Sequence, residues 1–125
     1  MNFKDNLKYN EEHLWLKIED NKATIGITDF AQSRLGEILF VELPDVDDEF
    51  DLGEEFSVVE SSKSASSLYA PFNIKILEVN EKLDDEPEYI NEDPYGGWII
   101  KAEIMNNDSM GKLIDCNEYK DIVNG

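Results

Sequence analysis

The segment FSVVESSKSASSLYAP, residues 56–71, places one lysine, Lys63, among small polar side chains. Five serines and one alanine lie within four positions of this lysine. The apolar stretches FSVV and LYA on either side are typical of strands, so we predict a hairpin with its turn near Lys63. A lysine at such a tip extends into water as a flexible, strongly hydrated cation. The segment therefore predicts a displayed amine.

This amine is expected to act as an attachment point and not as a catalyst. Nothing in the segment desolvates Lys63, so the lowered pKa that amine catalysis requires is not indicated. Acylation would remove the charge of the side chain and add a long tether. Ser62 and Ser64 leave room for a modifying enzyme, and Glu60 offers that enzyme a negative charge. From the residues alone, the alternative is an ordinary surface lysine in a polar hairpin.

The chain around this hairpin is dominated by strand patterns. Besides the two strands of the hairpin, we predict strands at 14–19, 22–27, 38–43, 74–79 and 98–104. Thr28 is expected to cap a short helix that ends at Gly36, and a second helix is expected over 117–124. The sequence thus predicts a mainly β fold, a compact barrel or sandwich with short flanking helices, in one domain over residues 1–125.

Composition argues against several classes of function. The 29 acidic and 11 basic residues give a net charge of −18, which disfavours nucleic acid and anionic membranes and favours partners with basic faces. One histidine and one cysteine provide neither a metal cluster nor a catalytic triad. With no long apolar run and no signal-peptide core, a cytoplasmic protein is expected; a matrix location would require a transit peptide removed before residue 1.

The chain resembles the H proteins of the glycine cleavage system, a family of lipoyl carriers, over residues 7–123. The segments that carry the resemblance are LKYNEEHLW, ATIGITDFAQSRLGEILFVELP, FSVVESSKSASSLYAP, EVNEKL and INEDPYGGWIIK. The resemblance implies that Lys63, at the lysine of an E-S-x-K motif, carries lipoate in amide linkage. It also implies a small barrel-sandwich hybrid of the lipoyl- and biotinyl-carrier type, with this lysine on a hairpin turn.

The resemblance further implies a carrier that catalyses nothing itself. The lipoyl arm would accept an aminomethyl group from the pyridoxal-phosphate glycine decarboxylase, and the aminomethyltransferase would pass it to tetrahydrofolate. Dihydrolipoamide dehydrogenase would then reoxidise the arm, and a lipoate ligase or lipoyl transferase would attach it. The chemistry belongs to the cofactor, while the protein supplies presentation and docking.

Two departures from the family pattern concern the lipoyl arm. Leu14 stands where the family has the glutamate of H-E-W, and Ser67 stands where it has an aspartate four residues after the lysine. In the family, the loaded arm folds back onto the surface, where acidic groups hold its amine. We therefore expect arm contacts from Glu12, His13, Leu14 and Ser67, with Glu12 replacing one missing acid.

Further expectations concern packing. Ile74 replaces a family glycine and resists positive φ, so the turn before it is expected to change shape, with Asn73 in the left-handed position. For Cys116, which begins the last helix, a structural or incidental role is expected; the alternative is a thiol whose pKa is lowered by the helix dipole. Core or loop anchors are expected from the aromatic residues Trp15, Phe40, Tyr95 and Trp98.

Several functions remain open at this point. The first is the carrier of the glycine cleavage system. The second is an H-like protein that donates or relays lipoate or serves another lipoate-dependent pathway, which Leu14 and Ser67 favour. A biotin carrier is disfavoured, because biotinyl lysines usually sit between methionines. An enzyme is disfavoured too, because the sequence has no histidine pair, nucleophile elbow, phosphate loop or metal-ligand spacing.

Overall fold

The computed structural model describes residues 2–106 and 112–124. Its strands are β1 (Lys8–Tyr9), β2 (Leu14–Glu19), β3 (Lys22–Ile27), β4 (Ile38–Glu42), β5 (Glu49–Phe50), β6 (Glu55–Ser61), β7 (Ala65–Tyr69), β8 (Ile74–Val79) and β9 (Ile100–Ile104). Its helices are α1 (Asp29–Leu35), α2 (Lys82–Asp85), α3 (Tyr89–Glu92) and α4 (Cys116–Asn124). None of the helices in these ranges has the length and apolar character needed to cross a membrane.

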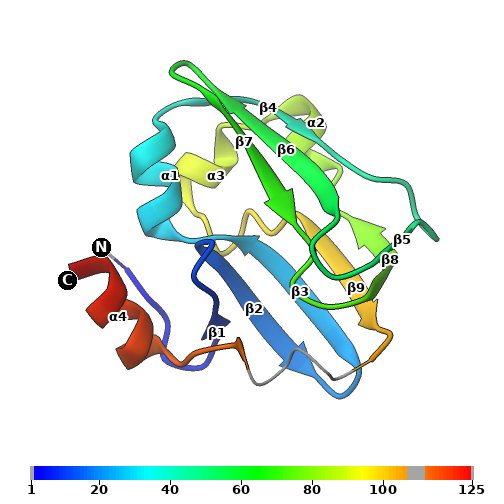
Figure 1. Cartoon of the computed structure of the whole chain (residues 1–125). Helices are drawn as coiled ribbons and strands as arrows, with labels where there is room; N and C mark the ends of the chain where they lie inside the picture. Colours follow the sequence, from blue (N-terminus) through cyan, green and yellow to red (C-terminus); the bar gives the residue numbers. More distant parts are fainter. Residues whose placement is uncertain (1, 107–111, 125) are drawn as a thin grey trace.

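Two sheets form a sandwich (Figure 1). The larger sheet has the order β1-β2-β3-β9-β8-β5, and the smaller has the order β4-β6-β7. Their inner faces share one apolar core, in which Ile25 and Ile76 of the larger sheet join Val59 and Leu68 of the smaller. The prediction of a mainly β fold with short helices is confirmed, in the form of two packed sheets that do not close into a barrel within residues 2–106 and 112–124.

Strands β2 and β3 and helix α1 form where alternation and capping residues predict them. Strands β2 and β3 have the predicted bounds and pair in continuous register from Leu14 opposite Ile27 to Glu19 opposite Lys22. At the start of α1, the Thr28 hydroxyl accepts a hydrogen bond from the amide of Ala31. Gly36 ends the helix with a φ of 81°. Alternation, capping chemistry and a glycine terminator therefore determined these elements locally.

The expectation that Asn73 takes the left-handed position before β8 was wrong. Ile74 is fully buried as the first residue of β8, where it pairs with Phe50 and Ile104. Asn73 does not have positive φ. Its side-chain carbonyl instead accepts a 2.7 Å hydrogen bond from the amide of Leu52. A buried β-branched residue suits the start of a strand, as Ile74 does here.

One packing expectation and one alternative also need correction. Trp15 and Tyr95 are buried and Trp98 is half-buried, but Phe40 is 48% exposed and belongs to no core. Cys116 is buried, and this burial raises the pKa of its thiol above the ordinary value instead of lowering it.

A second, aromatic core fastens α4 to the beginning of the chain. The rings of Tyr9 and Tyr119 stack with centroids 4.7 Å apart, and Phe3 meets Tyr119 edge-on. Asp115 and Glu118 form the capping box at the start of α4, with the Glu118 amide 2.8 Å from the Asp115 carboxylate. This second core holds α4 beside α1, on the side of the molecule where the candidate site lies (Figure 1).

Candidate functional site

The lysine hairpin, residues 61–65, lies where the sequence predicts it. Strands β6 and β7 pair in antiparallel register, and Ser62, Lys63 and Ser64 are exposed at the tip that joins them. Ser61 holds the turn together, because its hydroxyl accepts hydrogen bonds from the amides of Lys63 at 3.2 Å and Ser64 at 3.1 Å. Its own amide donates to the Ser64 carbonyl at 2.8 Å. The serines thus shape the turn as well as leaving room around the lysine.

The tip rests on the loop between α1 and β4. The Ser62 amide donates a 3.1 Å hydrogen bond to the carbonyl of Glu37. The stem of Lys63 passes over Gly36, so closely that a methyl group on this glycine would lie 3.4 Å from Lys63 Cε and 3.7 Å from Nζ. The lysine is therefore exposed, but its stem has a fixed neighbour at the carboxyl end of α1.

Asn91, on α3, holds this supporting loop in place. Its amide nitrogen donates to the Gly36 carbonyl at 2.8 Å and to the side chain of Gln32 at 2.9 Å. Its amide oxygen accepts from the Ile38 backbone at 2.9 Å. One side chain thus satisfies backbone groups on both sides of Glu37, the residue that receives the hairpin tip.

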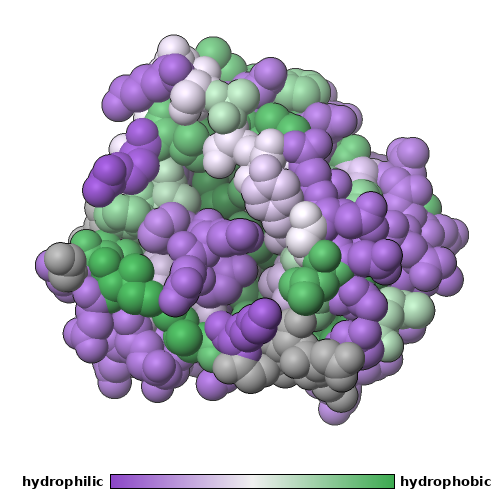
Figure 2. Space-filling view, viewed as in Figure 1, coloured by the Kyte–Doolittle hydropathy of each residue, from purple (hydrophilic) through white to green (hydrophobic). Residues whose placement is uncertain are grey.

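A cleft of about 520 Å³ opens beside the lysine hairpin. Its apolar walls are Phe30, Ala31 and Leu35 of α1, Leu68 of β7, and Ile122 and Val123 of α4. Polar groups are added by Glu12, His13, Arg34 and Ser66. Figure 2 shows apolar surface within the hollow of this face and hydrophilic side chains around it. Because Leu35 directly precedes Gly36, the cleft begins next to the loop that carries the lysine stem.

His13 lies at the polar end of this cleft. Its Nδ1 is 2.8 Å from the hydroxyl of Tyr119, which is 2.7 Å from the hydroxyl of Thr28. Burial, and then the nearby charge of Arg34, lower the pKa of the His13 imidazole below its ordinary value. Burial also raises the pKa of Tyr119 to about 12, so that its hydroxyl keeps its proton. The cleft therefore presents a neutral imidazole near neutral pH.

Of the four predicted arm contacts, the structure brings Glu12 and His13 to the cleft. The expectation for Leu14 was wrong, because this side chain is 1% exposed and packs in the main core. Ser67 does not line the cleft, but its neighbour Ser66 does. Since successive side chains of a strand point to opposite faces, Ser67 faces away from Ser66 and Leu68.

Sequence reasoning missed most of the cleft. Phe30, Arg34 and the end of α4 come from elements whose neighbours are set by the tertiary fold. Alternation along 65–69 could have indicated that only every second residue of β7 faces inward. Glu60, predicted to aid recognition, is exposed on β6 and lies opposite Ala65 and Phe40.

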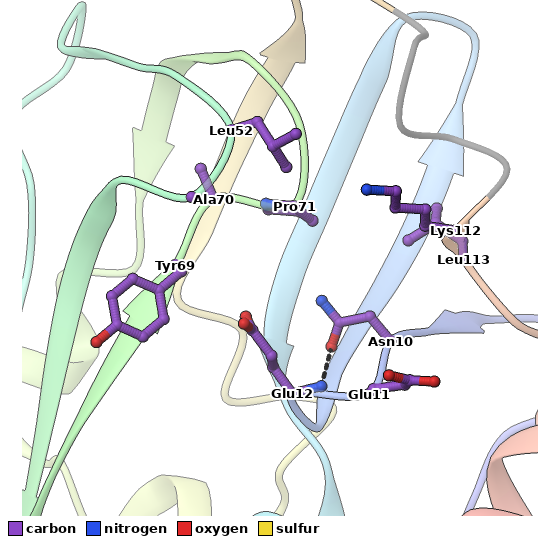
Figure 3. A pocket seen from close by; sticks show the side chains of 10 residues that line it. Asn10, Glu11, Glu12, Leu52, Tyr69, Ala70, Pro71, Lys112 and Leu113 are labelled. Carbon is purple, nitrogen blue, oxygen red and sulfur yellow. Dashed lines mark hydrogen bonds between the residues drawn. The ribbon is translucent and has the colours of Figure 1, made fainter.

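A second hollow, of about 410 Å³, adjoins the cleft at Glu12 (Figure 3). The carboxylate of Glu12 points across it towards Tyr69, and the Glu12 amide donates to the side chain of Asn10 at 3.1 Å. Glu12 lines both hollows, whereas Glu11 lines the second hollow only. Glu12 thus places a negative charge where the apolar cleft ends.

Comparisons with known proteins identify relatives of this chain. The family model described as glycine cleavage H-protein matches residues 7–125. A glycine cleavage system H protein of Halalkalibacterium halodurans is 52% identical over 98% of this chain and 96% of its own length. One from Alkaliphilus oremlandii is 56% identical over 90% and 89% of the two chains.

A solved structure extends the similarity to the fold. The crystal structure of a glycine cleavage system H protein from Mycobacterium marinum superposes with a TM-score of 0.87 at 34% identity, covering 95% of this chain and 97% of its own. Residues 7–125, which the family model matches, include the lysine hairpin, its supporting loop and the strands of both sheets. The chain belongs to the glycine cleavage H-protein family.

Proposed function

We propose that this protein is the lipoyl carrier of a glycine cleavage system, with lipoate joined in amide linkage to Nζ of Lys63. The observation that carries the proposal is an exposed amine at a hairpin tip, whose stem passes over Gly36 to the start of an apolar cleft. Membership of the H-protein family supports the same assignment.

The residues of the cleft fit such an arm. The apolar walls suit an aliphatic chain, and the polar end suits a cargo that carries a charged amine. When attached, lipoate supplies a disulfide that takes up and releases an aminomethyl group. The protein's own side chains hold and shield the arm.

Glu12 is proposed to hold the cargo amine. It is the one carboxylate among the residues that line the cleft in the described part of the chain. A hydrogen bond from an ammonium group to a carboxylate is stronger than one between neutral groups, and the exposed Glu12 can be reached from the cleft. His13 assists by remaining neutral near pH 7, since an imidazolium would repel the ammonium.

The proposed partners are glycine decarboxylase, aminomethyltransferase and dihydrolipoamide dehydrogenase, together with the enzyme that attaches lipoate. A net charge of −18 suits docking to basic faces on these enzymes. The protein is proposed to contribute presentation of the arm, and the enzymes to contribute catalysis.

Modification of Lys63 tests the first part of the proposal. Incubation with a lipoate ligase, ATP and lipoate should add the mass of one lipoyl group, mapped to Lys63 by peptide mass. Lys63→Arg should remain unmodified, while Lys17→Arg, at another exposed lysine, should be modified at the native rate. Lipoate found at a different lysine would contradict the assignment.

Carriage of the cargo tests the second part. The lipoylated protein should support exchange of labelled bicarbonate into glycine by glycine decarboxylase. Glu12→Gln should speed the loss of formaldehyde from loaded protein about tenfold, because a charged hydrogen bond contributes roughly 1.5–3 kcal/mol. Glu11→Gln, outside the cleft, is the matched control and should behave like the native protein.

One observation favours a second candidate function. Leu14 and Ser67 stand where the family pattern has acidic residues, and neither side chain carries a carboxylate. A lipoylated protein that supports no bicarbonate exchange, but passes lipoate on to another apoprotein, would identify it as a lipoate donor or relay.

A further inference from the structure

Strand β4 exposes two adjacent apolar side chains beside the lysine hairpin. Leu39 is 54% exposed and Phe40 is 48% exposed. Both reach solvent because the pairing with β6 shifts from Ile38 opposite Ser61 to Phe40 opposite Glu60, which leaves Leu39 as an extra residue. Such a bulge turns neighbouring side chains out of strict alternation. We call this pair the Leu39–Phe40 patch.

The patch is close to Lys63 through the sheet. Ile38, which precedes the patch, pairs with Ser61 at the base of the lysine turn. The Glu37 carbonyl, two residues before Leu39, accepts the amide of Ser62. A molecule that contacts the hairpin tip from the β4 side would therefore meet the patch as well.

Exposed carboxylates surround the patch. Glu37 precedes it and Glu42 follows it on the same segment, while Glu60 lies opposite Phe40 on β6. An apolar centre with an acidic rim suits a partner that offers an apolar pocket bordered by lysine or arginine. A second copy of this chain does not meet that description, because its net charge is also −18.

The position of Lys63 Nζ indicates which class of partner docks on the Leu39–Phe40 patch. An enzyme that acylates Lys63 must bring its activated acyl group to Nζ itself, which lies beside Gly36 in the supporting loop. Its surface must then lie against the hairpin and the neighbouring β4. Enzymes that act on the disulfide work at the far end of the tether, so they can remain at a distance from β4.

We propose that the Leu39–Phe40 patch, with Glu37, Glu42 and Glu60, is the docking site of the enzyme that acylates Lys63. This inference rests on the proposed lipoylation of Lys63. In that reaction Nζ, after losing a proton to solvent, attacks the acyl carbon of a lipoyl-adenylate. The amide C–N bond forms, the nitrogen loses its second proton to solvent, the bond from the acyl carbon to the phosphate oxygen breaks, and AMP leaves.

Acylation kinetics test the docking site. With a lipoate ligase, ATP and lipoate, Phe40→Ser should raise the KM for the unmodified protein about tenfold, with kcat nearly unchanged, because a buried aromatic contact is typical of the centre of an interface. Leu39→Ser should act in the same direction. Val46→Ser, at a 52% exposed apolar residue outside the smaller sheet, is the matched control and should leave KM unchanged.

The acidic rim is tested by salt. The KM of the native protein should rise with ionic strength, since exposed charge pairs are screened at physiological salt. Replacing both Glu42 and Glu60 by Gln should raise KM at low salt and flatten this dependence. Replacing Glu78 and Glu81 by Gln removes the same charge from exposed positions elsewhere. This control should change neither the KM at low salt nor its dependence on salt.

The outcomes separate this inference from the proposed function. If the native protein is never acylated at Lys63, the proposed function fails. If it is acylated and Phe40→Ser keeps the native KM, only the docking site is overturned. It is overturned as well if lipoylated Phe40→Ser loses affinity for glycine decarboxylase or dihydrolipoamide dehydrogenase while the ligase is unaffected. Equal thermal unfolding of native protein, Phe40→Ser and Val46→Ser would show that the fold is intact.

Discussion

The protein contains two hairpins that are supported in different ways. The β2–β3 hairpin pairs continuously to its tip, turns at Asp20 with a φ of 56°, and packs Leu16 and Ile25 into the main core. The β6–β7 hairpin that carries Lys63 has a register shift between Glu55 and Ser57, away from its turn. Its turn is held by Ser61, and its tip rests on the Gly36–Ile38 loop. The first is held by its own pairing and burial, whereas the tip of the second depends on a neighbouring loop.

This difference shows what displaying an amine requires. A turn made of small polar residues has no apolar side chain to fix it, so its position must come from hydrogen bonds to the rest of the molecule. Glu37 supplies the direct contact, and Asn91 supplies the contacts behind it. Substitutions in each hairpin test this difference in support.

The largest effect is expected from the core of the β2–β3 hairpin. Ile25 is fully buried, so Ile25→Ala should lower the free energy of unfolding by about 2–5 kcal/mol. Urea denaturation followed by circular dichroism would measure the loss. Ile25→Val is the conservative control, with an expected loss of about 0.5–1.5 kcal/mol. If Ile25→Ala lowered the free energy of unfolding by less than Asn91→Ala does, core burial would not be the main support of the β2–β3 hairpin.

A smaller but more localised effect is expected at Asn91. Asn91→Ala should cost roughly 1–3 kcal/mol, because the Gly36 carbonyl and the Ile38 amide lose their partner. It should also speed amide hydrogen exchange at Ser62, measured by NMR. Asn80→Ala is a matched control, since Asn80 likewise donates to a backbone carbonyl, that of Trp98. Equal exchange at Ser62 in both variants would show that Asn91 does not position the tip.

The turn itself should respond less. Ser61→Ala removes the hydroxyl that accepts from Lys63 and Ser64, with an expected cost of roughly 0.5–1.5 kcal/mol. Amide exchange should rise at Ser64 while the pairs of the β2–β3 hairpin stay protected. Ser61→Thr keeps a hydroxyl and should restore protection at Ser64. Loss of protection across both hairpins would show that they unfold as one unit.

The smallest effect concerns pH. The pKa of His13 is lower in the folded protein than its ordinary value of 6.5, so the unfolded chain takes up the proton first as the pH falls. The contribution of His13 to the free energy of unfolding is therefore fully present above about pH 6.5. It declines as the pH falls towards the lower pKa of the folded protein. Urea denaturation between pH 7.5 and 5 should show a shallower decline for His13→Gln. An unchanged slope would mean that other groups cause the acid sensitivity.

How much of the molecule the sequence could predict depended on whether the deciding interactions were local. Thr28 and Gly36 define α1 within nine residues, and alternation defines β2, β3 and β8. Phe40 was misplaced because the bulge at Leu39 leaves no mark in the hydrophobic pattern.

The candidate site shows the same limit. Lys63 could be identified because its hairpin carries the information in one segment. The cleft could not, because it requires α1, β7 and α4 to meet, and the contact between Tyr9 and Tyr119 that holds α4 joins opposite ends of the chain. Spacing from the lysine suggested Ser67, but the packing of the sheet determines that Ser66 faces inward.

The length of α1 matters for the lysine site as well as for packing, because of Gly36. The same residue ends the helix and lies under the lysine stem. One extra residue in α1 would turn its carboxyl end by about 100° and advance it by about 1.5 Å, which would carry the glycine away from the lysine. The length of α1 therefore determines where Gly36 lies, and with it the position of the Lys63 side chain from which a tether would extend. An insertion in α1 should therefore misdirect the tether even where both sheets fold normally.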